Sequence, residues 1–194
     1  ELAKSDINRL NGLLKITDQM HEVLLGGESN IEVTKNTERF ALLGSALKRK
    51  AIVMCRNGGE WDDIEGVLKE SAKAYLDGEG VSFDYNFDPY ASVNHMQLSG
   101  VLGLTVDNAQ QQIEKSQEAA RRNFLKTLDF FPAVIVADAE VAAYLLADPV
   151  ANKEAKALTV HEQAAELLKH FDSAVKDVPR SGRQFHTVVQ QLYC

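Results

Sequence analysis

Apolar residues recur at helical spacing along almost the whole of this 194-residue chain, and alternating patterns typical of strands are nearly absent. Because steps of three and four residues place side chains on one face of a helix, the sequence predicts an all-α fold. About eight helices are expected. Their ranges are roughly 4–25, 37–56, 61–77, 89–104, 107–128, 133–147, 160–176 and 182–193.

The second and third expected helices form the clearest pair. Each carries one apolar stripe, Phe40, Leu43, Leu47, Ala51 and Met54 in the first and Trp61, Ile64, Leu68, Ala72 and Tyr75 in the second. The short turn Asn57-Gly58-Gly59 between them predicts an antiparallel hairpin, followed by a loop from Gly78 to Phe87. Gly44 lies on the first stripe, where a glycine costs about 1 kcal/mol relative to alanine. We therefore expect another helix to approach closely there.

The later helices have recognisable starts. Asp88-Pro89 combines a cap residue with a proline at the first helical position. Thr159 with Glu162, and Ser181 with Gln184, match the capping box. Residues 107–128 carry a narrow stripe, Ile113, Ala120, Phe124 and Leu128, typical of an outer helix. The stretch 130–136 alone would also suit a strand, but the apolar run continues to Leu145 and favours a helix.

The spacing of the helices favours antiparallel pairs stacked as an α-solenoid over a closed four-helix bundle. We expect one helical-repeat domain over residues 1–194, cut from a larger protein, because the chain starts with helical character at Glu1 and has no initiating Met. The net charge of −7 disfavours nucleic acid as a partner. No apolar run is long enough to cross a bilayer. Cys55 and Cys194 suggest no disulfide framework, so a reducing cytoplasm is expected.

Two short segments resemble a known family. The helix Gly44-Ser45-Ala46-Leu47-Lys48-Arg49 and the helix start Tyr90-Ala91-Ser92-Val93-Asn94 look like the tetratricopeptide-like TRAFs-binding domain. That family occurs in some stress-activated kinases and, in bacterial form, beside effector domains such as caspase-like peptidases. The resemblance covers residues 34–145 best. Leu47 and Ala91 depart from it, since an aromatic residue and a proline are usual at those positions.

The resemblance implies a non-catalytic scaffold that recruits or regulates a neighbouring domain, with a protein or peptide as partner and no cofactor or metal. The residues expected to contact that partner are Lys48, Arg49 and Asn94. A second basic cluster, Arg121, Arg122 and Lys126, reads as a solvated helix face, with a phosphate or acidic-peptide site as the alternative. His161-Glu162 begins like a helical zinc motif, but Ala165 stands where the second histidine is required.

Two other hypotheses stay open at this point. A small helical enzyme could use Cys55 as nucleophile with His95 as base, or Asp138, an acidic residue in an apolar helix that normally requires a polar partner. Alternatively, the chain could self-assemble through its last helix, whose apolar residues are Val188, Val189, Leu192 and Tyr193.

Overall fold

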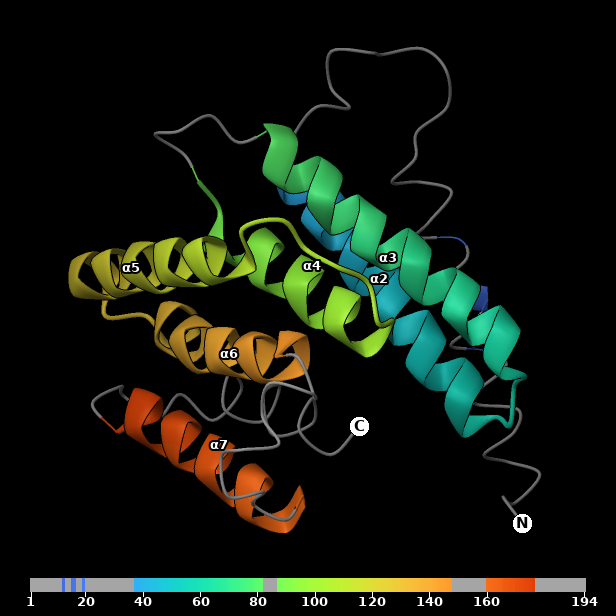
Figure 1. The fold of residues 1–194 in the computed structure, drawn as a ribbon. Helices are drawn as coiled ribbons and strands as arrows, with labels where there is room; N and C mark the ends of the chain where they lie inside the picture. The colour runs from blue at the N-terminus through green and yellow to red at the C-terminus, as the bar shows by residue number, and fades with distance from the viewer. Residues whose placement is uncertain are drawn as a thin grey trace. The chain divides into compact units, whose positions relative to one another are not determined.

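The computed structural model describes residues 37–81, 87–147 and 160–176, together with the isolated helical positions 12, 15, 16 and 19. Six helices and no strand are found in this part of the chain, so the all-α prediction is confirmed there (Figure 1). Eight helices were expected. The last expected helix, 182–193, and nearly all of the first, 4–25, lie outside the described residues. The stacked solenoid stays a prediction.

The contacts within the chain group it into two compact units, Glu1–Leu104 and Thr105–Cys194. Helices α2, α3 and α4 belong to the first unit, and α5, α6 and α7 belong to the second. Each unit is described by itself below. The expectation of a single domain over the whole chain stays a prediction.

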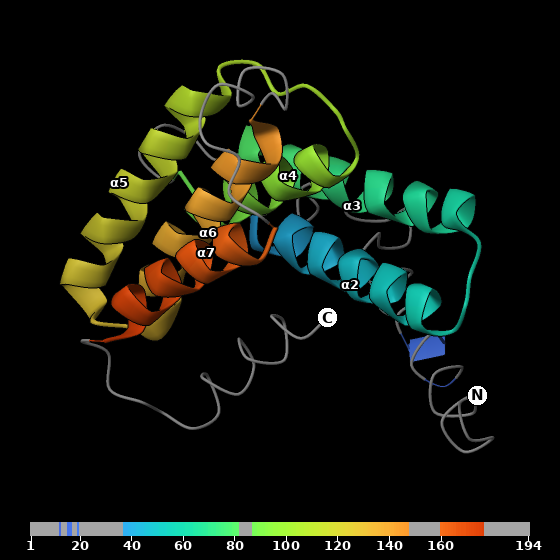
Figure 2. The ribbon, with the colours of Figure 1, turned by 60° about the horizontal axis from the view of Figure 1, so that its bottom comes forward.

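The first unit is built on the expected hairpin. Helix α2 (Thr37–Arg56) and helix α3 (Trp61–Val81) lie side by side and antiparallel in both ribbon views (Figures 1 and 2). Gly58 in the turn between them has φ +74°, a conformation that glycine adopts without steric cost. The predicted loop at Gly78 is wrong, because α3 continues for one more turn to Val81. Gly78 is buried there, and packing offsets its low helix propensity.

At Gly44 the backbone of α2 lies close against the Tyr75 ring of α3. A Cβ atom on Gly44 would lie 2.7 to 2.9 Å from the ring carbons of Tyr75, so only glycine fits. Next to this contact, the Ser71 hydroxyl donates a buried 2.7 Å hydrogen bond to the Gly44 carbonyl oxygen. The prediction that a neighbouring helix approaches closely at Gly44 is therefore confirmed.

Most of the two predicted stripes is buried or half-buried, with one clear exception. Trp61, the first residue of α3, is 56% exposed, so its assignment to the apolar stripe is wrong. It lies in the first turn of the helix, next to the exposed residues Asp62 and Asp63. Buried members of this core include Leu43, Leu47 and Tyr75.

Helix α4 (Pro89–Val101) completes the first unit, and its start confirms the sequence prediction. Asp88 is the N-cap, and its Oδ1 accepts a 3.0 Å hydrogen bond from the Tyr90 backbone N–H. Ala91 and Leu98 pack against Tyr75 of α3 in one apolar cluster. Helix α4 therefore adds a third helix to the α2–α3 hairpin.

The second unit consists of α5 (Ala109–Thr127), α6 (Phe130–Leu146) and α7 (Val160–Val175). Helix α6 packs against both α5 and α7. Its core contains Phe130, Ala133, Val134 and Ala137 of α6 with Phe171 of α7. The stretch 130–136 is thus helical, as favoured over a strand.

Leu128 does not belong to the buried stripe of α5, and that part of the prediction is wrong. The buried residues of α5 are Ile113, Ser116, Ala119 and Ala120. Leu128 lies one residue past the helix in the left-handed conformation, φ 54° and ψ 24°, and is 60% exposed. The backbone reverses direction at that position, so its side chain leaves the helical register.

Candidate functional site

Two of the three residues predicted to bind a partner instead contact each other. The Lys48 ammonium donates a 2.6 Å hydrogen bond to Oδ1 of Asn94, and the Asn94 amide donates to the Tyr90 carbonyl at 2.9 Å. Asn94 is only 5% exposed, while Lys48 is half-buried. This pair joins α2 to α4, which is a structural role. Their role in partner binding stays a prediction.

Arg49, the third of these residues, is exposed on α2 and remains accessible to a partner. Its positive charge acts on Tyr75, but burial of the Tyr75 ring is the larger effect and raises the pKa of that hydroxyl well above its usual range. Tyr75 is therefore a neutral core residue. The rings of Tyr75 and Tyr90 meet edge to face, with centroids 5.9 Å apart.

Cys55 and His95, the nucleophile and base of the enzyme hypothesis, both belong to the first unit. Cys55 is exposed near the end of α2, and His95 lies in α4. No hydrogen bond joins the two side chains among the described residues. Asp138 lies in the other unit, is half-buried and takes part in a polar or electrostatic interaction.

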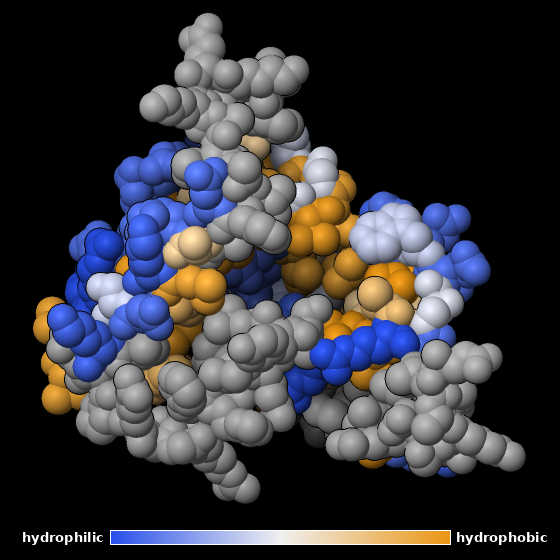
Figure 3. All heavy atoms as spheres, turned by 90° about the horizontal axis from the view of Figure 1, so that it is seen from below, coloured by the Kyte–Doolittle hydropathy of each residue, from blue (hydrophilic) through white to orange (hydrophobic). Residues whose placement is uncertain are grey.

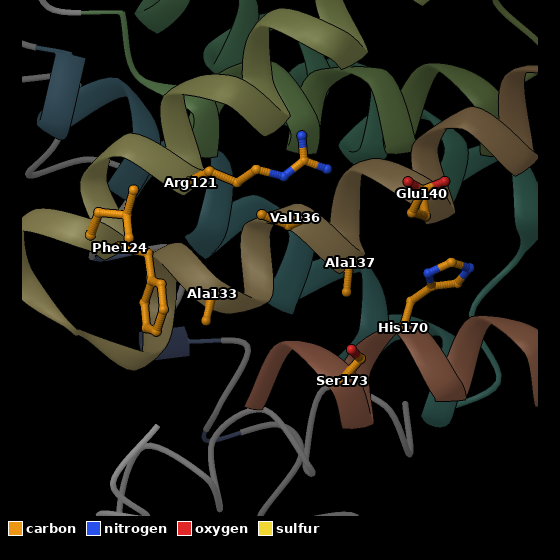
Figure 4. A pocket seen from close by; sticks show the side chains of 9 residues that line it. Arg121, Phe124, Ala133, Val136, Ala137, Glu140, His170 and Ser173 are labelled. Carbon is orange, nitrogen blue, oxygen red and sulfur yellow. The ribbon is translucent and has the colours of Figure 1, made fainter. Parts of the chain in front are cut away.

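A concave site lies within the second unit, between α5, α6 and α7. It is an open cavity of about 600 Å³, which we call the α5–α7 groove (Figure 4). Its apolar lining comes from Phe124, Leu125, Ala133, Val136 and Ala137. Its polar lining comes from Arg121, Glu140, His170 and Ser173. Volumes of this size are typical of binding pockets.

Opposite charges face the α5–α7 groove from two helices. Arg121 projects from α5, and Glu140 projects from α6 (Figure 4). Glu140 accepts a 2.6 Å hydrogen bond from the Gln117 side chain, which orients its carboxylate. Arg121 is exposed and has no hydrogen bond or ion pair with any residue that the structure describes. Its guanidinium is thus available to a carboxylate or an aromatic ring.

His170 and Ser173 share the groove with Glu140, which raises the question of a catalytic relay. Such a relay needs hydrogen bonds that link acid, base and nucleophile. Among the described residues, no hydrogen bond joins His170 to either Glu140 or Ser173, and His170 and Ser173 are both exposed. The arrangement suits recognition of a polar group better than activation of a nucleophile.

One margin of the α5–α7 groove is apolar and exposed. Leu125 lines the groove and is 77% exposed, and Leu128 and Phe131 follow at the α5–α6 turn with 60% and 48% exposure. Figure 3 shows hydrophobic atoms gathered at the left edge, the side on which α5 ends in Figure 1. Clustered exposed apolar side chains of this kind are typical of interaction surfaces.

The sequence flagged only part of this groove. Arg121 was noted within a basic cluster and interpreted as a solvated face, while Glu140, His170 and Ser173 carried no signal. No group of His, Cys, Asp or Glu suited to a metal ion occurs among the residues described, and none of the described helices is long and apolar enough to cross a membrane.

Comparison of the chain with models of protein families, with curated proteins and with solved structures gives no match. The resemblance of Gly44–Arg49 and Tyr90–Asn94 to the TRAFs-binding domain therefore stays a prediction.

Proposed function

We propose that this chain is a non-catalytic protein-interaction module, a scaffold or regulatory part of a larger effector or signalling protein, and that the α5–α7 groove is its binding surface. The observation that carries the proposal is an open cavity of about 600 Å³ with an apolar floor, an exposed apolar margin and an arginine without a partner among the described residues.

Each part of the groove has a role in binding a peptide or a partner helix. Phe124, Ala133 and Ala137 give the groove an apolar floor, against which an apolar side chain of the partner can pack. Burial of one large apolar side chain contributes about 1.5–3 kcal/mol. Arg121 and Glu140 set the orientation of the bound segment through charge, as rim groups do in other interfaces. The exposed free thiol of Cys55 favours a reducing cytoplasm as the location.

The proposal is tested by affinity capture with the purified chain and with three variants. Leu125→Glu places a charge in the groove. The variant is expected to capture no partner protein, because an apolar side chain of the partner then binds the groove less favourably. Leu76→Glu is the matched control, since Leu76 is 47% exposed on α3, belongs to the first unit and does not line the groove. Arg49→Glu tests the surface predicted from the sequence. Circular dichroism verifies that all variants keep their helicity.

Capture that is lost with Leu125→Glu and retained with Leu76→Glu supports the groove. Capture that is lost with Arg49→Glu alone would move the binding surface to α2, and equal capture by all variants would contradict a role for the groove.

A further inference from the structure

Trp61 is the one tryptophan of the chain. It is 56% exposed at the first position of α3 and belongs to neither of the apolar clusters described in that unit. A tryptophan buries more apolar area than almost any other side chain and is enriched among the residues that dominate interfaces. An exposed tryptophan of this kind suits a role in an interface.

The residues around Trp61 are acidic. Glu60, Asp62 and Asp63 flank it, all exposed. The nearest basic residues along the chain are Arg56, five positions before Trp61, and Lys69, eight positions after it. Carboxylates are favoured at a helix start because they complement the helix dipole, which accounts for the charge but not for the tryptophan. Together, Glu60, Trp61, Asp62 and Asp63 form an acidic, aromatic surface that we call the Trp61 end.

Arg121 gives the α5–α7 groove a positive charge that suits the carboxylates of the Trp61 end. Arg121 can lie against the face of an indole ring or pair with a neighbouring carboxylate, and Glu140 can accept the indole N–H. Phe124 offers an aromatic wall, and Lys126 adds a second positive charge near the apolar margin. The cavity of about 600 Å³ is large enough for an aromatic side chain.

We propose that a second copy of this chain inserts its Trp61 end into the α5–α7 groove. This inference rests on the proposed function, because it assigns the partner of the same groove. The two contacting surfaces differ, so the interface is head to tail, and each molecule offers one Trp61 end and one groove. Such an interface adds one copy after another, and it gives either a closed ring or an open filament.

The test uses analytical ultracentrifugation of the full chain and of two complementary variants. Trp61→Ala removes the inserted side chain but keeps the groove, and Arg121→Glu disables the groove but keeps Trp61. The wild-type mass is expected to rise with concentration in the micromolar to millimolar range. Each variant alone is expected to stay monomeric, with an association constant at least about tenfold lower.

A mixture of the two variants gives the most specific result. One intact groove and one intact Trp61 remain in it, so a one-to-one dimer is expected, with no larger species. Because Trp61→Ala contains no tryptophan, all tryptophan fluorescence comes from Trp61 of the Arg121→Glu partner. Its emission is expected to shift to shorter wavelength on mixing, as the indole leaves water.

Lys73→Glu is the control for charge, since Lys73 is exposed on α3, three turns from Trp61, and undergoes the same change of charge. It should assemble like the wild type. A wild-type chain that is monomeric throughout, or variants that assemble as well as the wild type, would overturn the inference. If the chain is monomeric but a different protein is captured and lost with Leu125→Glu, the proposed function stands and only the self-contact fails.

Discussion

At the scale of single residues, the packing of the first unit depends on a glycine, Gly44, which has no side chain. Gly44 brings the α2 backbone against the ring of Tyr75, and the Ser71 hydroxyl bonds the Gly44 carbonyl in the space beside it. Tyr75 has no solvent exposure, so its ring cannot move outward to make room. Interiors packed at this density tolerate little added volume. The packing of α2 on α3 is therefore most sensitive to volume at Gly44.

Gly44→Ala is expected to destabilise the protein even though alanine is the better helix former. The added Cβ meets three ring carbons closer than 3.0 Å, and overpacking of this kind costs about 1–3 kcal/mol. The gain in helix propensity is only about 1 kcal/mol, so the midpoint of thermal unfolding should fall. Gly66→Ala is the matched control, because nothing lies within 4 Å of its added Cβ, and its midpoint should rise. Equal effects of the two substitutions would contradict the close contact.

The sequence predicted the close contact at Gly44 but not the hydrogen bond between Lys48 and Asn94. A glycine on an apolar helical face is costly by itself, so close approach at Gly44 could be inferred locally. The Lys48–Asn94 hydrogen bond joins residues 46 positions apart, and no local pattern pairs them. Both were predicted to contact a partner, although Asn94 is almost completely buried.

At the scale of elements, helix positions followed well from periodicity. The expected range 37–56 agrees with α2, and 107–128 and 160–176 each lie within two residues of α5 and α7 at both ends. These segments have apolar stripes and clear start or stop signals. The α5–α7 groove was not predicted, because it depends on how three separate helices pack. Exposure at Trp61 was also missed, since helical spacing places a side chain on the apolar face but does not show whether another helix covers it.

The end of α5 contains backbone strain that a substitution can release. Leu128 adopts the left-handed conformation, which costs a residue with a Cβ roughly 1–2 kcal/mol, and its N–H closes the helix by donating to the Phe124 carbonyl at 2.7 Å. Leu128→Gly should therefore be about 1 kcal/mol more stable than Leu128→Ala, since both remove the exposed side chain and only glycine removes the strain. Urea unfolding of the two variants measures the difference.

The same pair of variants separates stability from binding. Because Leu128 belongs to the exposed margin of the groove, both substitutions should weaken capture of a partner, including the variant that is the more stable of the two. Glycine and alanine variants of equal stability would contradict the left-handed conformation at this residue.

At the scale of the whole molecule, pH changes stability through two opposing effects. The chain carries a net charge of −7, so lowering the pH from neutral reduces its self-repulsion and favours the compact state. His95 in α4 acts in the opposite direction. Its Nδ1 is buried without a hydrogen-bond partner among the described residues, and burial lowers the pKa of the ring below its usual value of 6.5.

The sign of the His95 contribution follows from which state binds the proton more readily. At pH values above 6.5 the ring is neutral in both states, and His95 does not oppose folding. As the pH falls below 6.5, the unfolded chain takes up a proton that the folded protein resists, so stability is lost until the folded pKa is also passed. His95→Gln removes the contribution of His95 to the pH dependence of stability and leaves the effect of net charge in place. Between neutral pH and about pH 5.5, the midpoint of thermal unfolding of the wild type should therefore fall relative to that of His95→Gln. Parallel pH profiles of the two proteins would mean that His95 is as well solvated in the folded protein as in the unfolded chain.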